Sequence, residues 1–185
     1  MALSPEARRE LLAIARESIR QGLRGRRYVP QAPTLPELAR PAGAFVTLHE
    51  AGALRGCIGT FQADRPLYLN VAEMARAAAF EDPRFPPLRP EEFGRIDLEI
   101  SVLSPMRRAR PEEVEVGRHG VYIVHGLHRG VLLPQVAVEQ GWDRETFLDH
   151  TCLKAGLPPG AWRHGAEVHV FEAEVFGEKD LEAEA

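Results

Sequence analysis

Apolar residues recur every three to four positions near the start of the chain, a spacing that predicts an amphipathic helix. Ser4 is a typical helix cap and Pro5 suits the first helical position, while Gly22 and Gly25 end the pattern. The face expected to be buried consists of Leu11, Ile14, Ala15, Ser18 and Ile19. Residues 28–41 are rich in proline and have no periodicity, so we expect a surface loop there.

The middle of the chain alternates between apolar and polar residues, which predicts half-buried strands. Residues 44–50 and 53–61 are expected to form a hairpin that turns at Ala51 and Gly52. Residues 95–103 alternate most cleanly, with Ile96, Leu98, Ile100 and Val102 on one side. Further strands are expected over residues 120–124, 131–134 and 167–176.

Two more helices are expected, over residues 64–80 and 143–155, each capped by the aspartate that opens it. Between them, residues 82–87 contain three prolines and cannot be helical. Residues 177–185 form an acidic tail that we expect to fray. Because helices and strands mix without a regular β-α-β rhythm, the predicted class is α+β, with a mainly antiparallel sheet and packed helices.

The composition is that of an ordinary folded protein. Its 185 residues point to one domain, or one domain with a small appended lobe. The hydrophobic share of 44% and the charged share of 27% exclude a disordered or fibrous chain. No apolar run approaches the roughly 18 residues that span a bilayer, and acidic residues stand where a signal peptide would be apolar. We therefore expect a cytoplasmic protein without membrane contact.

Charge and cysteine content exclude further classes. The net charge of −4 supplies no basic field to attract nucleic acid, and arginine clusters at 24–27 and 107–110 are more typical of solvated surface. Cys57 and Cys152 are expected to be free thiols. His125 and His128 lack a third ligand nearby in sequence, and no phosphate or dinucleotide loop is present. Neither a metal nor a cofactor is predicted.

The most informative local sequence is LRGCIGT at residues 54–60. In a regular strand Arg55, Cys57 and Gly59 share one face, while Leu54 and Ile58 face the core. A guanidinium on the same face favours the thiolate form of the cysteine. A reactive thiol in a glycine-lined slot, formed by Gly56 and Gly59, is therefore one interpretation, because strand glycines often mark the close approach of a ligand or another backbone. A small residue packed inside a tight strand is the other.

Two more groups are candidates for chemistry. Asp82, Arg84 and Phe85 lie in the proline-flanked loop, which is well suited to present side chains. They could instead pair with each other and merely close the loop. Among the histidines, His119 is a weak candidate for a base that activates Cys57, since exposed loop histidines usually have no catalytic role. We expect the loop 82–85 to fold against residues 55–57, where Asp82 could hydrogen-bond Arg55 or take a proton from the thiol.

The motif at 54–61 resembles the signature of the AMMECR domain family, whose prokaryotic members are called AmmeMemoRadiSam system protein A. The similarity extends over residues 11–176, so the expected arrangement is a single AMMECR domain over residues 1–185. The further matching segments are FVTL at 45–48, EDPRFPPL at 81–88, ISVLSP at 100–105, LLPQVA at 132–137, GWD at 141–143 and CLKAGL at 152–157. The sequence departs from the family at His119, where many relatives carry Asp, which argues against His119 as an indispensable base.

The resemblance implies an α+β fold with a larger and a smaller lobe, and a family whose activity is not established. It implies an association with a Memo-like protein and a radical S-adenosylmethionine protein, and hence a role in modifying a protein or tRNA. Carried over by position, it marks Arg55, Gly56, Cys57 and Gly59, together with Asp82, Arg84, Phe85 and Gln135.

Two function classes follow. In the first, the protein is a thiol-dependent enzyme or enzyme subunit with Cys57 as nucleophile or carrier, Arg55 as electrostatic support, and Asp82 or His119 handling protons. In the second, it is a module that binds a ligand, RNA or a protein, and Cys57 is only small enough to fit a glycine-lined slot.

Overall fold

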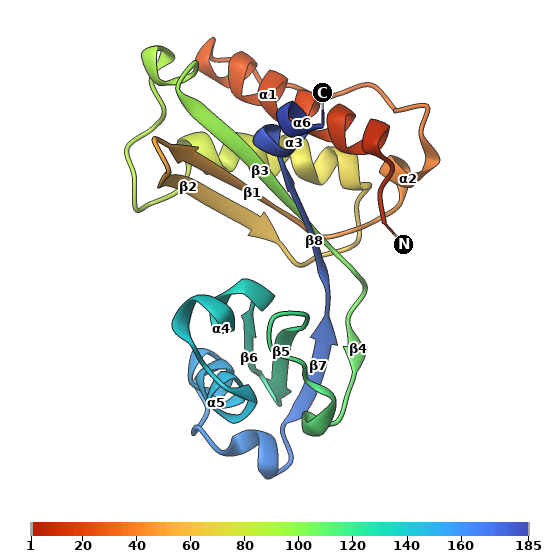
Figure 1. Ribbon diagram of the computed structural model, residues 1–185, viewed down its shortest axis with the longest axis vertical. Helices are drawn as coiled ribbons and strands as arrows, with labels where there is room; N and C mark the ends of the chain where they lie inside the picture. Colours follow the sequence, from red (N-terminus) through yellow and green to blue (C-terminus); the bar gives the residue numbers. More distant parts are fainter. Residues whose placement is uncertain (1, 185) are drawn as a thin grey trace. The chain divides into compact units, whose positions relative to one another are not determined.

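The computed structural model describes residues 2–184, which divide into two compact units (Figure 1). The first unit contains residues 2–103 and 174–184, and the second contains residues 104–173. Each unit has its own four-stranded sheet and its own hydrophobic core. The predicted α+β class, with mainly antiparallel sheets, is confirmed.

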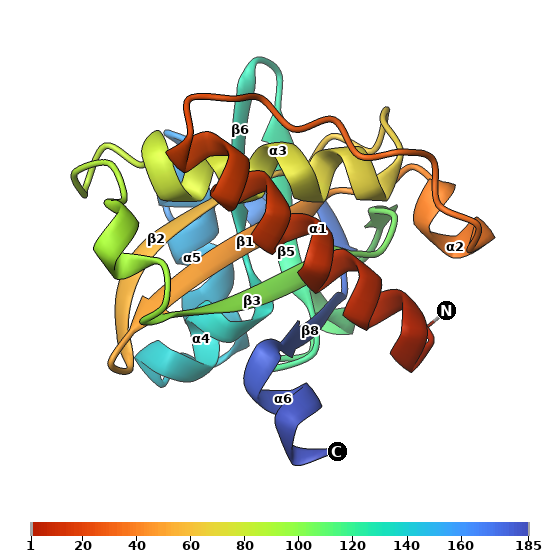
Figure 2. The same cartoon turned by 90° about the horizontal axis from the view of Figure 1, so that it is seen from above.

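The sheet of the first unit has the strand order β2-β1-β3-β8. Its strands are β1 (Ala44–Glu50), β2 (Ala53–Thr60), β3 (Ile96–Leu103) and β8 (Ala173–Gly177). Helices α1 (Pro5–Leu23) and α3 (Leu67–Phe80) lie on the same face of this sheet (Figure 2). The predicted hairpin is present, and its turn residues Ala51 and Gly52 both have positive φ, as a tight two-residue hairpin turn requires.

Helix α1 begins and ends as its sequence predicts. The Ser4 hydroxyl accepts a hydrogen bond from the Ala7 N–H at 3.2 Å, and Pro5 occupies the first turn. Every residue of its predicted apolar face is buried. The helix packs on α3, with Ser18 donating to the carbonyl of Ala72 at 2.5 Å.

Two expectations for the following segments are wrong. Asp64 does not cap α3, because the helix starts at Leu67 and Pro66 is its N-cap residue. The predicted loop contains a short helix, α2 (Pro36–Ala39), since Pro36 stands at a first helical position.

The C-terminal segment also differs from its prediction. The single strand expected there is divided by Glu172 into β7 (Glu167–Phe171), which belongs to the second sheet, and β8, which belongs to the first. The acidic tail forms helix α6 (Glu178–Ala183). Glu178 anchors it by accepting hydrogen bonds from Arg16 at 2.6 Å and from the Leu98 N–H at 2.9 Å.

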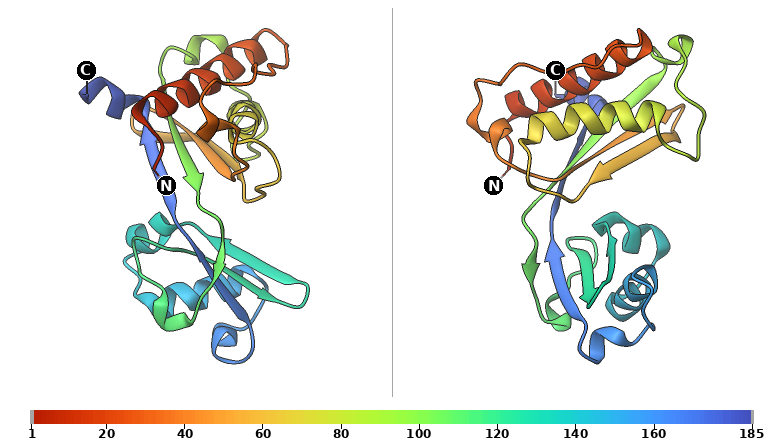
Figure 3. Two further views of the ribbon diagram at one scale, coloured as in Figure 1. Left: turned by 90° about the vertical axis from the view of Figure 1, so that its right-hand side faces the viewer. Right: turned by 180° about the vertical axis from the view of Figure 1, so that it is seen from behind.

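The second unit has the strand order β4-β7-β5-β6, with β4 (Arg107–Arg108), β5 (Gly120–His125) and β6 (His128–Leu132). Helix α5 (Arg144–Lys154) packs against β5 and β6, and can be followed in both views of Figure 3. Asp143 caps α5 as predicted, accepting from the Thr146 N–H at 2.8 Å. Helix α4 (Pro134–Gln140) was not predicted; the strand expected over residues 131–134 ends at Leu132, and the helix begins at Pro134.

The chain enters and leaves the second unit at adjacent residues. The Ser104 N–H donates to the Glu172 carbonyl, and the Glu172 N–H donates to the Ser104 hydroxyl, both at 2.8 Å. Within residues 2–184, no helix has both the length and the apolar content to cross a membrane.

Candidate functional site

A β-bulge interrupts strand β2 next to Cys57. Leu48 of β1 pairs with Gly56, whereas His49 pairs with Leu54, so Arg55 is the additional residue. Simple alternation therefore fails at this point. Leu54, which was expected to face the core, is exposed. The spacing of Arg55 and Cys57 therefore no longer implies that their side chains lie on the same face.

Arg55 is buried and binds a carboxylate that the sequence did not single out. Its Nε donates to Oε1 of Glu92 at 2.9 Å, and its Nη2 donates to Oε2 at 3.2 Å and to the Pro86 carbonyl at 2.9 Å. The hydrogen bond from Arg55 lowers the pKa of Glu92 to about 2. The charge of Arg55 is thus matched by Glu92, and the expected pairing of Arg55 with Asp82 is wrong.

The two glycines of the motif are covered by the protein itself. A Cβ atom on Gly56 would lie 2.2 Å from the carbonyl oxygen of Ala78 in α3. A Cβ on Gly59 would lie 2.1 Å from the ring of Phe45, which pairs with Gly59 across the hairpin. The close approach that these glycines indicate is therefore made by a helix backbone and an aromatic ring.

Cys57 lies on the sheet face opposite the helices. It pairs directly with Thr47 of β1, whose hydroxyl donates to Sγ at 3.2 Å. Glu99 of β3 is the partner of Thr47 on its other side, and His49 follows on the same face. Cys57 is half-buried as a residue, and its sulfur accepts a hydrogen bond from the Thr47 hydroxyl.

Asp82 fixes the loop after α3 to the backbone of Cys57. Its Oδ2 accepts from the Cys57 N–H at 2.9 Å and from Nη2 of Arg84 at 2.8 Å. Its Oδ1 accepts from the Arg84 main-chain N–H and Nε, both at 3.0 Å. These bonds, the Arg84 side chain first, hold the pKa of the Asp82 carboxyl well below its usual range. Such a carboxylate is a fixed acceptor and is poorly suited to take a proton from the thiol.

Arg84 and Phe85 complete the loop. Nη2 of Arg84 lies 3.4 Å from the carbonyl oxygen of Cys57, and the Arg84 side chain is 56% exposed. The Phe85 ring centroid is 5.6 Å from the guanidinium carbon of Arg84 and 5.8 Å from that of Arg55. The pKa of Arg84 is raised, chiefly by its hydrogen bond to Asp82.

The remaining candidates belong to the second unit. His119 is buried, and its Nδ1 accepts from the Glu115 N–H at 3.0 Å, which makes it a structural residue of the loop before β5. Gln135 lies in the first turn of α4. Both residues belong to the second unit, whereas Arg55, Cys57, Asp82 and Arg84 belong to the first.

Cys152 provides an internal comparison for Cys57. Both cysteines are free, but Cys152 is 0% exposed within the core of the second unit. Burial raises the pKa of its thiol. The two thiols therefore differ in access and in surroundings.

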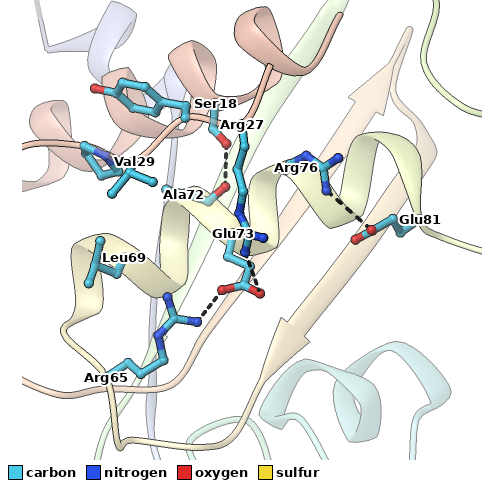
Figure 4. A pocket seen from close by; sticks show the side chains of 11 residues that line it. Ser18, Arg27, Val29, Arg65, Leu69, Ala72, Glu73, Arg76 and Glu81 are labelled. Atoms are coloured by element: carbon cyan, nitrogen blue, oxygen red, sulfur yellow. Dashed lines mark hydrogen bonds and ion pairs between the residues drawn. The ribbon is translucent and has the colours of Figure 1, made fainter. Parts of the chain in front are cut away.

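A separate pocket of about 200 Å³ lies between α1, α3 and the segment after α1 (Figure 4). Arg65 forms an ion pair with Glu73, whose carboxylate also lies 3.7 Å from Arg27. Arg76 is 3.4 Å from Glu81. Each of these three guanidinium groups therefore lies near a carboxylate.

Sequence reasoning missed Thr47 and Glu92. Thr47 falls in a predicted strand, but its partner depends on the register of a hairpin that sequence alone does not supply. Glu92 lies in a short 3-10 helix, η1 (Pro90–Glu92), and its acidic neighbours gave no reason to prefer it. Among residues 2–184, no three histidine, cysteine or acidic side chains cluster in a way that could hold a metal ion.

Comparison with known proteins gives a consistent result. The family model described as AMMECR1 matches residues 12–176. Protein MK0488 of Methanopyrus kandleri is 43% identical over 93% of this chain and 88% of its own length. Protein PF1979 of Pyrococcus furiosus is 44% identical over 91% and 87%. The crystal structure of the uncharacterized protein PH0010 from Pyrococcus horikoshii is similar with a TM-score of 0.83 and 42% identity, over 91% of this chain and 90% of that one.

Proposed function

The chain belongs to the AMMECR1 family, and within that family we propose that it is a thiol-dependent enzyme or enzyme subunit with Cys57 Sγ as its reactive atom. One observation carries the proposal. Cys57 is a half-buried residue whose sulfur accepts a hydrogen bond from Thr47, while Asp82 accepts from its backbone N–H and Arg84 lies beside its carbonyl. A packing cysteine would need none of these polar contacts.

The chemistry follows from these contacts. A Cys57 thiolate forms a bond to an electrophilic atom of the substrate, and the leaving group departs with its electron pair. The thiol proton passes to solvent, since Asp82 is already engaged by four donors. The Thr47 hydroxyl donates to the charged sulfur.

The substrate class and the partners are part of the proposal. The family resemblance supports a modification system in which this protein acts with a Memo-like protein and a radical S-adenosylmethionine protein. The substrate is then a protein or a tRNA. The paired arginines of the first unit favour a specific contact over general binding of nucleic acid.

Limiting alkylation tests the identity of the reactive thiol. Folded protein treated with substoichiometric iodoacetamide at neutral pH should carry the label on Cys57, as read by peptide mass spectrometry. Cys152 should react only after denaturation, because it is fully buried. Labelling of Cys152 first, or none at Cys57, contradicts the proposal.

Substitution of Cys57 separates the thiol enzyme from a binding module. In a reconstituted mixture with the two proposed partners, Cys57→Ser should abolish product formation, because an alcohol is a far weaker nucleophile than a thiolate. Cys152→Ser is the matched control and should retain activity if it folds. Full product yield with Cys57→Ser would favour a module in which Cys57 only packs.

A further inference from the structure

The two acidic side chains near Phe85 are already engaged by donors of the protein itself. All four carboxylate oxygens of Asp82 and Glu92 accept at least one hydrogen bond. The two guanidinium groups beside the ring have donors left over. Nη1 of Arg55 is buried with no acceptor among the described residues, and none of them accepts from Nη1 of Arg84. A ligand that fits this environment supplies acceptor oxygens.

Arg84 is the donor that a ligand can reach. Its side chain is 56% exposed, whereas that of Arg55 is only 10% exposed. Arg84 donates hydrogen bonds from Nε and Nη2 to the Asp82 carboxylate, and these bonds fix the guanidinium plane before any ligand binds. A fixed planar fork suits a carboxylate or phosphate oxyanion better than a flexible ammonium does.

The position of Arg84 links this donor to the reactive thiol. Oδ2 of Asp82 accepts from both Nη2 of Arg84 and the N–H of Cys57, so the two residues share one anchor. Nη2 of Arg84 also lies 3.4 Å from the Cys57 carbonyl. An oxyanion bound at Arg84 is therefore held next to the residue that carries the sulfur.

We propose that Arg84 binds an oxyanion group, carboxylate or phosphate, of the molecule that reacts at Cys57. The inference rests on the proposed function and narrows its substrate class to molecules with such a group close to the electrophilic atom. Arg84 then contacts substrate directly, while Asp82 acts as a positioning residue through Arg84.

Two alkylating agents that differ in charge test this inference. Iodoacetate and iodoacetamide react in the same way: a bond forms between sulfur and carbon, and iodide leaves with its electron pair. Only iodoacetate carries a carboxylate. The measured quantity is the ratio of the two rate constants at Cys57, which cancels general changes in thiol reactivity.

We expect Arg84→Gln to lower the iodoacetate-to-iodoacetamide ratio about fivefold, the size of a partly exposed charge contact. Arg9→Gln, which removes an exposed arginine from α1, is the control for net charge and should leave the ratio unchanged. In the wild type, added salt should lower the ratio, because screening weakens the contact.

Competition distinguishes the two oxyanions and does not depend on a folded variant. Inorganic phosphate or acetate should slow the labelling of wild-type Cys57 by iodoacetate more than by iodoacetamide, and the stronger competitor indicates the group that the site prefers.

An unchanged ratio of the two labelling rate constants in folded Arg84→Gln overturns the inference. If that variant does not fold, the wild type decides: the inference is overturned if phosphate and acetate each slow labelling by iodoacetate and by iodoacetamide to the same extent. If neither reagent labels Cys57, the proposed function is overturned instead.

Discussion

Asp82 is almost completely buried and binds both Arg84 and the backbone of Cys57. Asp82→Asn keeps the shape but replaces a charged acceptor by an amide. We expect the free energy of unfolding at pH 7 to fall by about 2 kcal/mol, the size of hydrogen bonds to a charged group. Urea denaturation measures it, and Asp64→Asn, at an exposed position, is the control. Equal stability of the two variants would show that Asp82 contributes nothing beyond its shape.

Glu92 gives the protein a dependence on acid. Its pKa in the folded state is about 2, below the value of about 4.3 for a free glutamate. The stabilisation is present above pH 4.3 and is lost as the pH falls toward 2. We therefore expect stability to decrease between pH 5 and pH 3 by less in Glu92→Gln than in the wild type, with a difference of about 1–2 kcal/mol. Parallel pH profiles in urea denaturation would contradict this.

The Thr47 hydroxyl donates a hydrogen bond to the sulfur of Cys57. Thr47→Val removes the hydroxyl and keeps the branched shape, so a charged sulfur loses one hydrogen bond. The rate of iodoacetamide labelling at Cys57 should fall about fivefold, which corresponds to about 1 kcal/mol. The control is Thr60→Val. Thr60 lies in β2, as Cys57 does, but its hydroxyl accepts from the Gln62 N–H, so this change should leave the labelling rate unchanged. Equal rates in both variants would remove Thr47 from the site.

At this scale the sequence predicted that the loop after the second helix meets the Cys57 strand, but it did not predict the partner of Arg55. Cys57, Asp82 and Arg84 were singled out, and they lie together. The partner of Arg55 was missed, because a buried ion pair forms between residues 37 positions apart. Only the three-dimensional path of the loop after α3 makes that contact.

At the scale of elements, the contact between α3 and β2 depends on Gly56. A side chain there would meet the carbonyl of Ala78, which is part of a helix backbone and cannot move away like a flexible side chain. We expect Gly56→Ala to lower the free energy of unfolding by about 2 kcal/mol. Gly94→Ala is the control, since nothing lies within 4 Å of its Cβ position. Circular dichroism during urea denaturation measures both, and a Gly56→Ala variant as stable as Gly94→Ala would refute the close contact.

Periodicity predicted most helices and strands, and the failures have physical causes. The bulge at Arg55 is invisible to a pattern of period two, because it adds one residue without changing the residue types around it. The division of the last strand at Glu172 is equally hidden, since β7 and β8 are both apolar and nearly continuous in sequence. Sheet membership is decided by partners far away in the chain.

At the scale of the whole molecule, the second unit contains residues that report on its own unfolding. Both tryptophans, Trp142 and Trp162, and the buried Cys152 lie in the second unit. We expect the urea midpoint of tryptophan fluorescence to coincide with the onset of Cys152 labelling, because both require the same core to open. Labelling of Cys152 at urea concentrations well below the fluorescence transition would show that α5 opens separately from its unit.

The division of the chain into two units also sets the order in which the two sheets can be completed during synthesis on the ribosome. Strand β8 (Ala173–Gly177), which completes the first sheet, is synthesised only after residues 104–172. At roughly 5–20 residues per second, the edge of β3 waits several seconds for its neighbour. During that interval the second unit is being synthesised, while the nascent first sheet still exposes the strand edge at which foreign chains can add. A strand that follows the whole second unit in sequence therefore closes the sheet that carries Cys57.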